Sequence, residues 1–315
     1  MQQFLPSWFR RGAIAALGGV GLVVIGAAGG SLHWSLDLLG QFLLPAFAVA
    51  LLIVPIAAFA RWPRIAGAAA VMAVAAYAVA APFVSAPRAV EGKPVRFRVL
   101  LFNVWYNNQQ LADVAQMIAK ANADIVVIVE APKRVQKALT SVAAAYPYHF
   151  DCGGLSCDAL IFSRSQLVPQ DIRVTSDPDR SPYVTLLTDI AGCRLTLLAT
   201  HMTRPFPNHP YWAQRAQARE IGSAVGLIPG AKLVLGDFNA APWGYVMRTI
   251  AERGGVKVLT GSGGTWPSVL LPQLRIPIDH MLAGPGLSFV SREVLPRIGS
   301  DHVPVLAEIA VTGCQ

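Results

Sequence analysis

Polar side chains stand where several short apolar runs of this sequence end or begin. They are carboxylates, amides and imidazoles, and the runs beside them are rich in β-branched residues. The residues in question are Asn103, Glu130, His201, Asp237, Asn239, Asp279, Asp301 and His302. Runs of this kind predict buried strands. Catalytic groups are often found at strand ends, where a loop meets a rigid scaffold.

Taken alone, each of these residues also has a structural explanation. Asp237 can cap a following helix, Asp279 can anchor a turn, and Glu130 can be a solvated strand end. If the carboxylates gather at one edge, however, they repel one another unless a cation neutralises them. The chain has no CxxC or HxxxH spacing, so these oxygen ligands favour Mg²⁺ or Mn²⁺ over Zn²⁺.

The elements that must position these groups alternate in type after residue 95. Strands are predicted at 96–103, 124–130, 158–163, 183–190, 194–201, 232–237, 277–283 and 302–311. Helices are predicted at 109–121, 132–145, 211–227 and 244–254. Strands and helices mixed in this way indicate one α/β sandwich domain over 96–315, which follows a polar linker at 88–95.

The polar run ends occur in an order that resembles the DNase I-like endonuclease/exonuclease/phosphatase family. The matching motifs are Asn103, Glu130, Thr200-His201, Gly236-Asp237-Phe238-Asn239, Ile278-Asp279-His280 and Ser300-Asp301-His302. The resemblance implies an α/β four-layer sandwich, in which two β-sheets are flanked by helices. It also implies a metal-dependent hydrolase of phosphoester bonds.

The resemblance assigns the metal-binding residues. Glu130 resembles the main metal carboxylate, with Asn103 and Asp301 near the ion, which would be Mg²⁺ or Mn²⁺. Arg180 resembles a phosphate-contacting arginine that precedes a proline in some members, although one arginine in a turn has many explanations.

The resemblance also assigns catalytic roles. Asp237 resembles the group that orients or deprotonates the attacking water, and Asn239 the group that holds the phosphate or the nucleophile. His201, and His302 paired with Asp279, would donate to phosphate oxygens as charge develops. Such a division suits phosphoryl transfer, which depends on positioning and charge neutralisation.

The first 90 residues have a different composition, with only six charged side chains. A signal peptide explains one apolar stretch but not several, and buried helices of a soluble protein are the remaining alternative. Gly26 and Gly30 form a small-xxx-small pair, which in so Gly-rich a segment is weak evidence for a helix dimer. We predict a membrane anchor over 1–87. Its three transmembrane helices lie in the uncharged stretches 12–36, 38–60 and 65–87.

The arginines predict the orientation of this anchor. Arg10 and Arg11 precede the first stretch, and Arg61 and Arg64 separate the second from the third. Positive charge marks the cytoplasmic side, so we expect a cytoplasmic N-terminus and an extracytoplasmic catalytic domain, as in a multi-pass protein of a bacterial inner membrane. Arg88 opposes this weakly.

Cysteine usage agrees with export. Cys152 and Cys157 bracket a flexible Gly-Gly-Leu-Ser turn and predict a local disulfide, while Cys193 and Cys314 offer a second pair. Four free thiols in a cytosolic domain are the alternative.

The expected function is therefore a phosphatase or phosphodiesterase at the outer face of a membrane, acting on a lipid-linked or other extracytoplasmic phosphoester. A membrane-anchored DNase I-like endonuclease and an inactive binding module are the alternatives. The net charge of +8 is weak evidence for nucleic acid, since half of it lies in the first 90 residues beside the apolar stretches.

Overall fold

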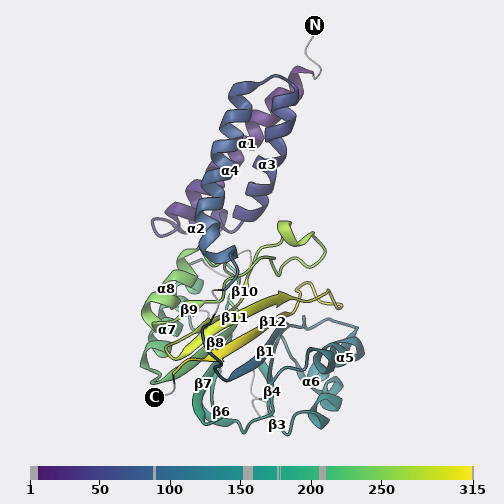
Figure 1. Ribbon diagram of the computed structural model, residues 1–315, viewed down its shortest axis with the longest axis vertical. Coiled ribbons are helices and arrows are strands. Elements are labelled where there is room, and N and C mark those ends of the chain that lie inside the picture. Colours follow the sequence, from purple (N-terminus) through teal and green to yellow (C-terminus); the bar gives the residue numbers. More distant parts are fainter. Residues whose placement is uncertain are drawn as a thin grey trace.

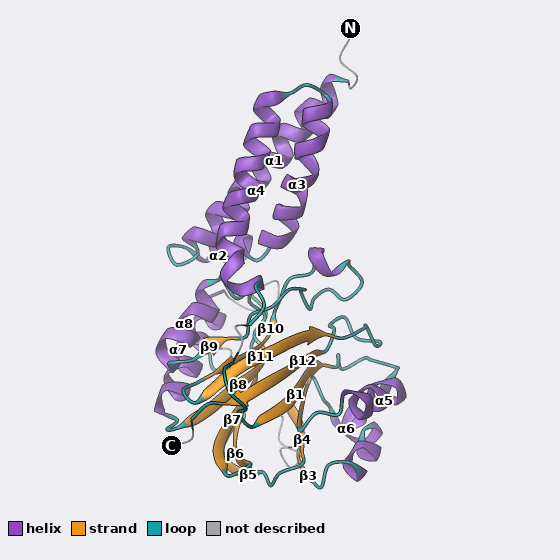
Figure 2. Cartoon of the chain, in the orientation of Figure 1, coloured by secondary structure: helices purple, strands orange, loops and turns teal. Residues whose placement is uncertain are grey.

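A bundle of apolar helices stands on one end of a two-sheet sandwich in this computed structural model (Figures 1 and 2). The structure describes residues 6–87, 90–151, 159–175, 177, 179–205 and 211–313. The bundle consists of α1 (Ser7–Gly29), α2 (Trp34–Gly40), α3 (Leu43–Phe59) and α4 (Pro63–Val84).

The three longer helices of the bundle bury small residues and expose large apolar ones. Ala50, Ala69 and Ala76 are fully buried between helices, whereas Leu52 and Val71 point outward and are exposed. Close packing through small residues and an apolar outer surface are typical of helices in lipid. By length and composition α1 and α4 could each cross a membrane, and the pair of α2 and α3 would be a third, bent crossing.

The structure divides the second predicted span, 38–60. Residues 34–40 form the separate helix α2, and α2 and α3 meet at a bend of 56°. As Figure 1 shows, α2 lies at the end of the bundle that faces the sandwich. Asp37, the acidic residue among the six charges of the first 90, is buried on this helix.

The sandwich contains two six-stranded mixed sheets. The first has the order β11-β12-β1-β2-β4-β3 and the second the order β5-β6-β7-β8-β10-β9. The first comprises β1 (Arg96–Asn103), β2 (Ile125–Val129), β3 (Tyr148–Phe150), β4 (Ala159–Ser163), β11 (Leu287–Val294) and β12 (Val305–Val311). The second comprises β5 (Val168–Arg173), β6 (Tyr183–Ile190), β7 (Cys193–His201), β8 (Ala231–Asp237), β9 (Lys257–Val258) and β10 (Asp279–Ala283).

Helices cover both outer faces of the sandwich, which confirms the predicted four layers. The first sheet is covered by α5 (Leu111–Ala121), α6 (Lys133–Ala138) and the 3₁₀ helix η1 (Thr140–Ala144). The second is covered by α7 (Tyr211–Leu227) and α8 (Tyr245–Gly254), and a short 3₁₀ helix, η3 (Pro272–Leu274), lies toward α3. Between the sheets, Val99, Val127, Leu197 and Leu233 belong to one fully buried core.

Most predicted strands are present within a few residues of their expected bounds, because each is an apolar run buried in a sheet. β5 was missed because its exposed, polar sequence contains Pro169 and lies at a sheet edge. β11 was missed because its residues are only partly buried, and β3 and β9 because they are very short. The helix predicted at 132–145 is divided into α6 and η1.

The strand directions bring the predicted site residues to one edge of the sandwich, which we call the catalytic rim. β1 and β2 are parallel, as are β7 and β8, so the carboxyl ends of these four strands lie at this edge. β10 and β12 run antiparallel to their neighbours and therefore begin there. His201 and Asp279 each pair in register with Asp237, one on either side of it.

Gly236 makes a close approach that no other residue type can make. Its φ is +155°, and a Cβ atom there would lie 1.8 Å from the carbonyl oxygen of Thr200 on β7. We expect Gly236→Ala to destabilise the protein by more than about 3 kcal/mol, because backbone must move. The matched control, Gly255→Ala, has φ +61° but open space, and should cost only about 1–2 kcal/mol. Thermal unfolding of both variants in detergent tests this, and equal losses would contradict it.

Candidate active site

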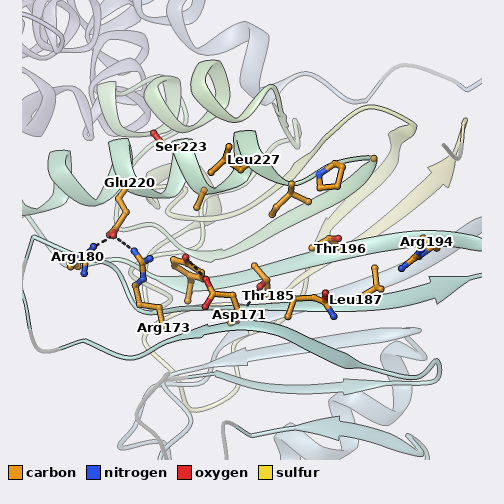
Figure 3. A pocket seen from close by; sticks show the side chains of 16 residues that line it. Asp171, Arg173, Arg180, Thr185, Leu187, Arg194, Thr196, Glu220, Ser223 and Leu227 are labelled. Atoms are coloured by element: carbon orange, nitrogen blue, oxygen red, sulfur yellow. Dashed lines mark hydrogen bonds and ion pairs between the residues drawn. The ribbon is translucent and has the colours of Figure 1, made fainter.

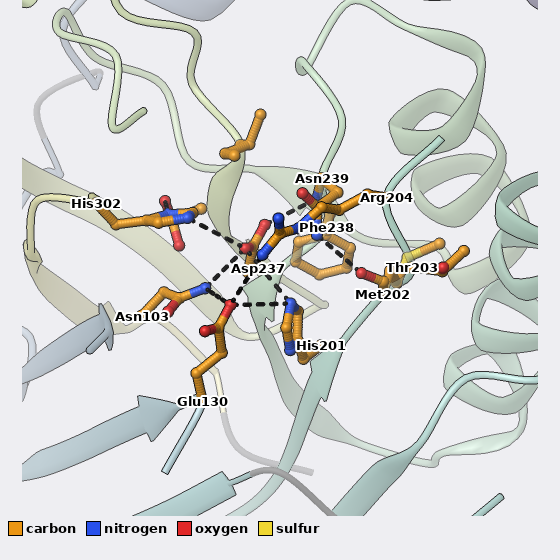
Figure 4. A network of polar contacts seen from close by, with 12 residues as sticks. Asn103, Glu130, His201, Met202, Thr203, Arg204, Asp237, Phe238, Asn239 and His302 are labelled. Carbon is orange, nitrogen blue, oxygen red and sulfur yellow. Dashed lines mark hydrogen bonds and ion pairs between the residues drawn. The ribbon is translucent and has the colours of Figure 1, made fainter. Parts of the chain in front are cut away.

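Asp237 lies at the centre of a polar network at the catalytic rim (Figure 4). Its carboxylate is 1% exposed, and Asn103 Nδ2 donates to its Oδ2 over 2.9 Å. The same Nδ2 donates to Glu130 Oε1 over 3.0 Å, so one amide bridges two buried carboxylates. Asn103 Oδ1 accepts from the backbone N–H of Trp105 over 3.0 Å, which fixes the orientation of the Asn103 amide.

His302 and Asp279 form a buried pair on one side of Asp237. His302 Nδ1 lies 2.8 Å from Asp279 Oδ2, and its Nε2 lies 3.7 Å from Asp237 Oδ2. The backbone N–H of Asp279 is directed at Thr265 Oγ1, 3.2 Å away. The structure therefore brings together the predicted pair and aims the second ring nitrogen of His302 at Asp237.

His201 and an unpredicted arginine lie on the other side. His201 Nε2 is 3.6 Å from Asp237 Oδ2 and 3.8 Å from Glu130 Oε1. Arg204 Nη2 is 3.7 Å from the same Glu130 oxygen, and this arginine is 55% exposed. The signal in the sequence was its position three residues after His201, in the loop that leaves the catalytic rim.

Two site residues have left-handed backbone, which is strained at Glu130. Glu130 has φ +55° and Asn239 has φ +49°, in the left-handed region that side chains other than asparagine rarely adopt. Asn239 is held by two bonds, since its N–H donates to Asp237 Oδ1 over 2.8 Å and its Nδ2 to Met202 O over 2.8 Å. Strain that the surroundings maintain is typical of functional sites.

Sequence reasoning also missed Gln214, a buried residue on α7. Its Nε2 is within hydrogen-bond distance of the carbonyl oxygens of Thr203, Phe238 and Asn239. It thus links the loop after His201 to the loop after Asp237. A polar residue on the buried face of an otherwise apolar pattern was the available signal.

Burial and neighbouring charges separate the pKa values of these groups. Burial, reinforced by Asp279, raises the pKa of Asp237 to about 6, although both site histidines oppose this. Burial would lower the pKa of His302, but the carboxylates of Asp279 and Asp237 raise it to about 10. Burial would raise the pKa of Asp279, yet contact with His302 lowers it. Without a bound cation, His302 is therefore a protonated donor at pH 7, and Asp237 is ionised and able to act as a base.

The residues present fit a divalent cation. Glu130, His201 and Asp237 each place a ligand atom within 4.8 Å of the others, and Asp237, Asp279 and His302 form a second such group. Among the described residues, the buried Oδ1 atoms of Asp279 and Asp301 have no hydrogen-bond partner. Concentrated carboxylates with orphaned oxygens are the donor set that Mg²⁺ or Mn²⁺ takes.

Two predicted metal ligands, Asn103 and Asp301, do not direct a ligand oxygen into either of these groups. The Asn103 amide directs its nitrogen, not its oxygen, toward Glu130 and Asp237. Asp301 Oδ2 accepts from Trp266 Nε1 over 3.1 Å, and Asp301 is in neither ligand group. Their assignment as ligands stays a prediction.

Arg180 is directed away from this network. Its Nε lies 3.3 Å from Glu220 Oε1, and Arg173 pairs with the same carboxylate, as Figure 3 shows. Both arginines line a cavity of about 810 Å³ between α7 and the outer face of β5, β6 and β7, whose lining contains no residue of the Asp237 network. Arg180 thus lies in this ion pair and Arg204 at the site itself, and the phosphate contact of Arg180 stays a prediction.

Comparison with known proteins identifies the family. The model of the "Endonuclease/Exonuclease/phosphatase family" matches residues 100–302. The chain belongs to the endonuclease/exonuclease/phosphatase family. A comparison with curated proteins gave no significant match.

Solved structures show the same fold for the catalytic part. A family protein from Bacteroides vulgatus covers 69% of this chain and 99% of its own, with 19% identity and a TM-score of 0.56. One from Bacteroides thetaiotaomicron covers 70% and 99%, with 17% identity and a TM-score of 0.55. A Staphylococcus aureus beta toxin double mutant, described with bound magnesium ions, covers 68% and 99%, with 17% identity and a TM-score of 0.50.

The family and the site together define the chemistry of this protein. It is a metal-dependent phosphoester hydrolase of the endonuclease/exonuclease/phosphatase family, with a buried cluster of carboxylates and histidines at the catalytic rim. The predicted disulfide of Cys152 and Cys157 lies outside the described residues, as does Cys314, while Cys193 is disulfide-bonded.

Cation binding should stabilise the folded hydrolase. At a Mn²⁺ concentration 100 times the dissociation constant, we expect the free energy of unfolding to rise by about 2.7 kcal/mol. Glu130→Gln should lose most of this gain because it removes a negatively charged ligand. In EDTA, without a cation, this variant should melt no lower than the wild type. Thermal unfolding with EDTA and with Mn²⁺ measures both. An equal gain in the two proteins would exclude Glu130 as a ligand.

The raised pKa of His302 predicts how stability varies with pH in the metal-free protein. The folded state holds this proton more tightly than the unfolded state, where the pKa is 6.5, so the stabilisation is complete below pH 6.5. It is lost as pH rises toward about 10. With EDTA present, the melting temperature should fall more steeply from pH 6.5 to 10 in the wild type than in His302→Gln. Parallel curves would contradict this.

Proposed function

We propose that this hydrolase acts at the outer face of a membrane on a phosphoester carried by a lipid. The observation that carries the proposal is the place where the anchor meets the sandwich. Trp243 follows the Asp237–Asn239 motif in the chain, and Ile278 precedes Asp279. Both pack in one apolar cluster with bundle residues such as Ala27, Leu43 and Ala80. The bundle therefore adjoins the catalytic rim and not the opposite edge of the sandwich.

This placement supports a substrate in the membrane plane. If α1 and α4 cross a bilayer, the catalytic rim lies beside the bilayer surface from which they emerge. Val269 and Leu271 are 68% and 67% exposed in the loop that carries η3, close to α3. Tethering the site beside the bilayer surface raises the effective concentration of lipid headgroups at the site.

The charges of the bundle support the outward orientation. Arg10 and Arg11 lie in the first turns of α1, and Arg61 and Arg64 lie at the turn between α3 and α4. The start of α1 and the turn between α3 and α4 both lie at the end of the bundle away from the sandwich (Figure 1). Positive charge favours the cytoplasmic side, and the disulfide at Cys193 fits an oxidising compartment.

The site residues can divide the reaction among them. A bound divalent cation would neutralise the phosphate and acidify water, and Glu130, His201 and Asp237 are the residues placed to hold it. Asp237 is also suited to take a proton from the attacking water. His302, which Asp279 keeps protonated, can donate from Nε2 to a phosphate oxygen. Asn239 and Arg204 lie where the phosphate can be oriented.

Hydrolysis by the full-length chain tests the enzymatic part of the proposal. With Mn²⁺, the protein in nanodiscs should hydrolyse bis-p-nitrophenyl phosphate, and Asp237→Asn and His302→Gln should each lower kcat by about 100-fold or more. Arg194→Ala, an exposed arginine outside the network, should stay within about twofold. Full activity in His302→Gln would contradict the assigned role.

The choice of substrate tests the finer part of the proposal. Phospholipid and prenyl-diphosphate substrates in the same nanodisc should be hydrolysed faster than soluble phosphoesters of the same headgroup. Cleavage of plasmid DNA without action on either lipid would establish the nuclease alternative instead. A reporter fused after residue 315 should be active outside the cytoplasm.

A further inference from the structure

The short helix α2 is held against α1 by an unusually close approach. A Cβ atom on Gly26 would lie 2.6 Å from Leu36 O, and one on Gly30 would lie 2.7 Å from Asp37 Oδ1. A Cβ on Gly40 would lie 2.8 Å from Ala27 Cα. The small-xxx-small pair of α1 thus packs a helix of the same chain, and α2 is fixed between α1 and the sandwich.

The polar groups of α2 are used by the loop that follows the catalytic Asp237. Asp37 Oδ1 accepts from the backbone N–H of Tyr245 over 2.7 Å, at the first residue of α8. Gln41 Oε1, beside the end of α2, accepts from the N–H of Ala241. Trp243 Nε1 donates to Gly40 O over 2.7 Å. Three donors of one loop thus find their acceptors on the anchor.

The side-chain acceptors on and beside α2 are buried, so losing these hydrogen bonds would destabilise the protein. Asp37 and Gln41 are 7% and 6% exposed, and Gln41 Nε2 donates back to Asp37 O over 3.2 Å. Arg215 and Arg248 of the sandwich attract the Asp37 carboxylate, but this attraction opposes only part of the cost of burying it. Arg215 also donates to Gly30 O over 2.8 Å and stacks on the ring of Tyr245. A buried carboxylate with these partners is costly to leave unpaired.

The other end of the same loop carries the catalytic groups. Gln214 contacts the carbonyl oxygens of Phe238 and Asn239, and His280 Nε2 contacts that of Ala240 over 2.9 Å. Burial lowers the pKa of His280 to about 4, so it is a neutral, structural imidazole. The loop is therefore fixed by the sandwich at Asn239 and by the anchor from Ala241 to Tyr245.

We propose that Asp37 and Gln41 on the anchor are positioning residues for the catalytic loop 237–245. The hydrolase site reaches its active geometry only when α2 is docked, so the anchor is part of the enzyme and not only a tether. This inference rests on the proposed function for the roles of Asp237 and Asn239. A misplacement of such groups by about 1 Å can cost 100-fold in rate.

Matched variants of Asp37 test the proposal in the full-length chain in nanodiscs. Asp37→Ala removes the acceptor for Tyr245 N–H, whereas Asp37→Asn keeps an oxygen there and removes only the charge. We expect Asp37→Ala to lower kcat for bis-p-nitrophenyl phosphate at least tenfold with KM within twofold, and Asp37→Asn to restore most of it. Ser35→Ala, on the same helix, should behave as wild type, because the Ser35 side chain contacts only His33 among the described side-chain hydrogen bonds.

A second pair of variants approaches the contact from the sandwich. Tyr245→Pro removes the N–H that Asp37 accepts, at a first helical position where proline is tolerated and follows an extended Gly244. Tyr245→Ala keeps that N–H and serves as its control for loss of the ring. A tenfold lower kcat in Tyr245→Pro than in Tyr245→Ala supports the proposal even if Asp37→Ala does not fold.

Hydrogen exchange separates this inference from the proposed function. The backbone N–H groups from 238 to 246, which exclude Pro242, should exchange at least tenfold faster in Asp37→Ala than in Asp37→Asn. They include the Asn239 N–H that donates to Asp237. Faster exchange confined to 241–246, or unchanged kcat with faster exchange, overturns the positioning role. If the wild type hydrolyses no phosphoester, the proposed function fails, while exchange at Asn239 still decides whether α2 positions the loop.

Discussion

The repulsion among buried carboxylates is the constraint around which the catalytic rim is built. Glu130, Asp237 and Asp279 lie within one small network, where burial makes each negative charge costly. Two side chains reduce this repulsion. The Asn103 amide donates to both Glu130 and Asp237, and the His302 imidazole is kept protonated by Asp279. What remains uncompensated is a concentration of oxygen ligands suited to a divalent cation.

The scaffold holds these charges together through backbone geometry. Two parallel strand pairs deliver four polar residues to one edge, and the close approach at Gly236 sets β8 against β7. Left-handed backbone at Glu130 and Asn239 then changes the direction of the two segments that follow β2 and β8. Because side chains from both sheets complete the network, its geometry depends on the packing of the whole sandwich.

The N-terminal helical bundle is also connected to the catalytic rim. Its apolar outer surface is suited to lipid, yet its lower end supplies hydrogen-bond acceptors and apolar contacts to loops of the catalytic rim. Asp37 would be expensive in a transmembrane helix, and the structure explains it as an acceptor for the first turn of α8. These contacts fix the bundle against the loops of the catalytic rim.

The sequence by itself predicted the strands of an α/β sandwich, because apolar runs with polar ends report strands and their rims directly. Its resemblance to the family predicted the four layers and most of the residues that gather at the catalytic rim. It did not reveal Arg204 or Gln214, whose roles come from contacts across loops, nor that Arg180 pairs with Glu220. Only the tertiary structure decided that α2 docks on the catalytic loop. Hydropathy records how apolar a segment is, whereas a partner 200 residues away in sequence is defined only by folding.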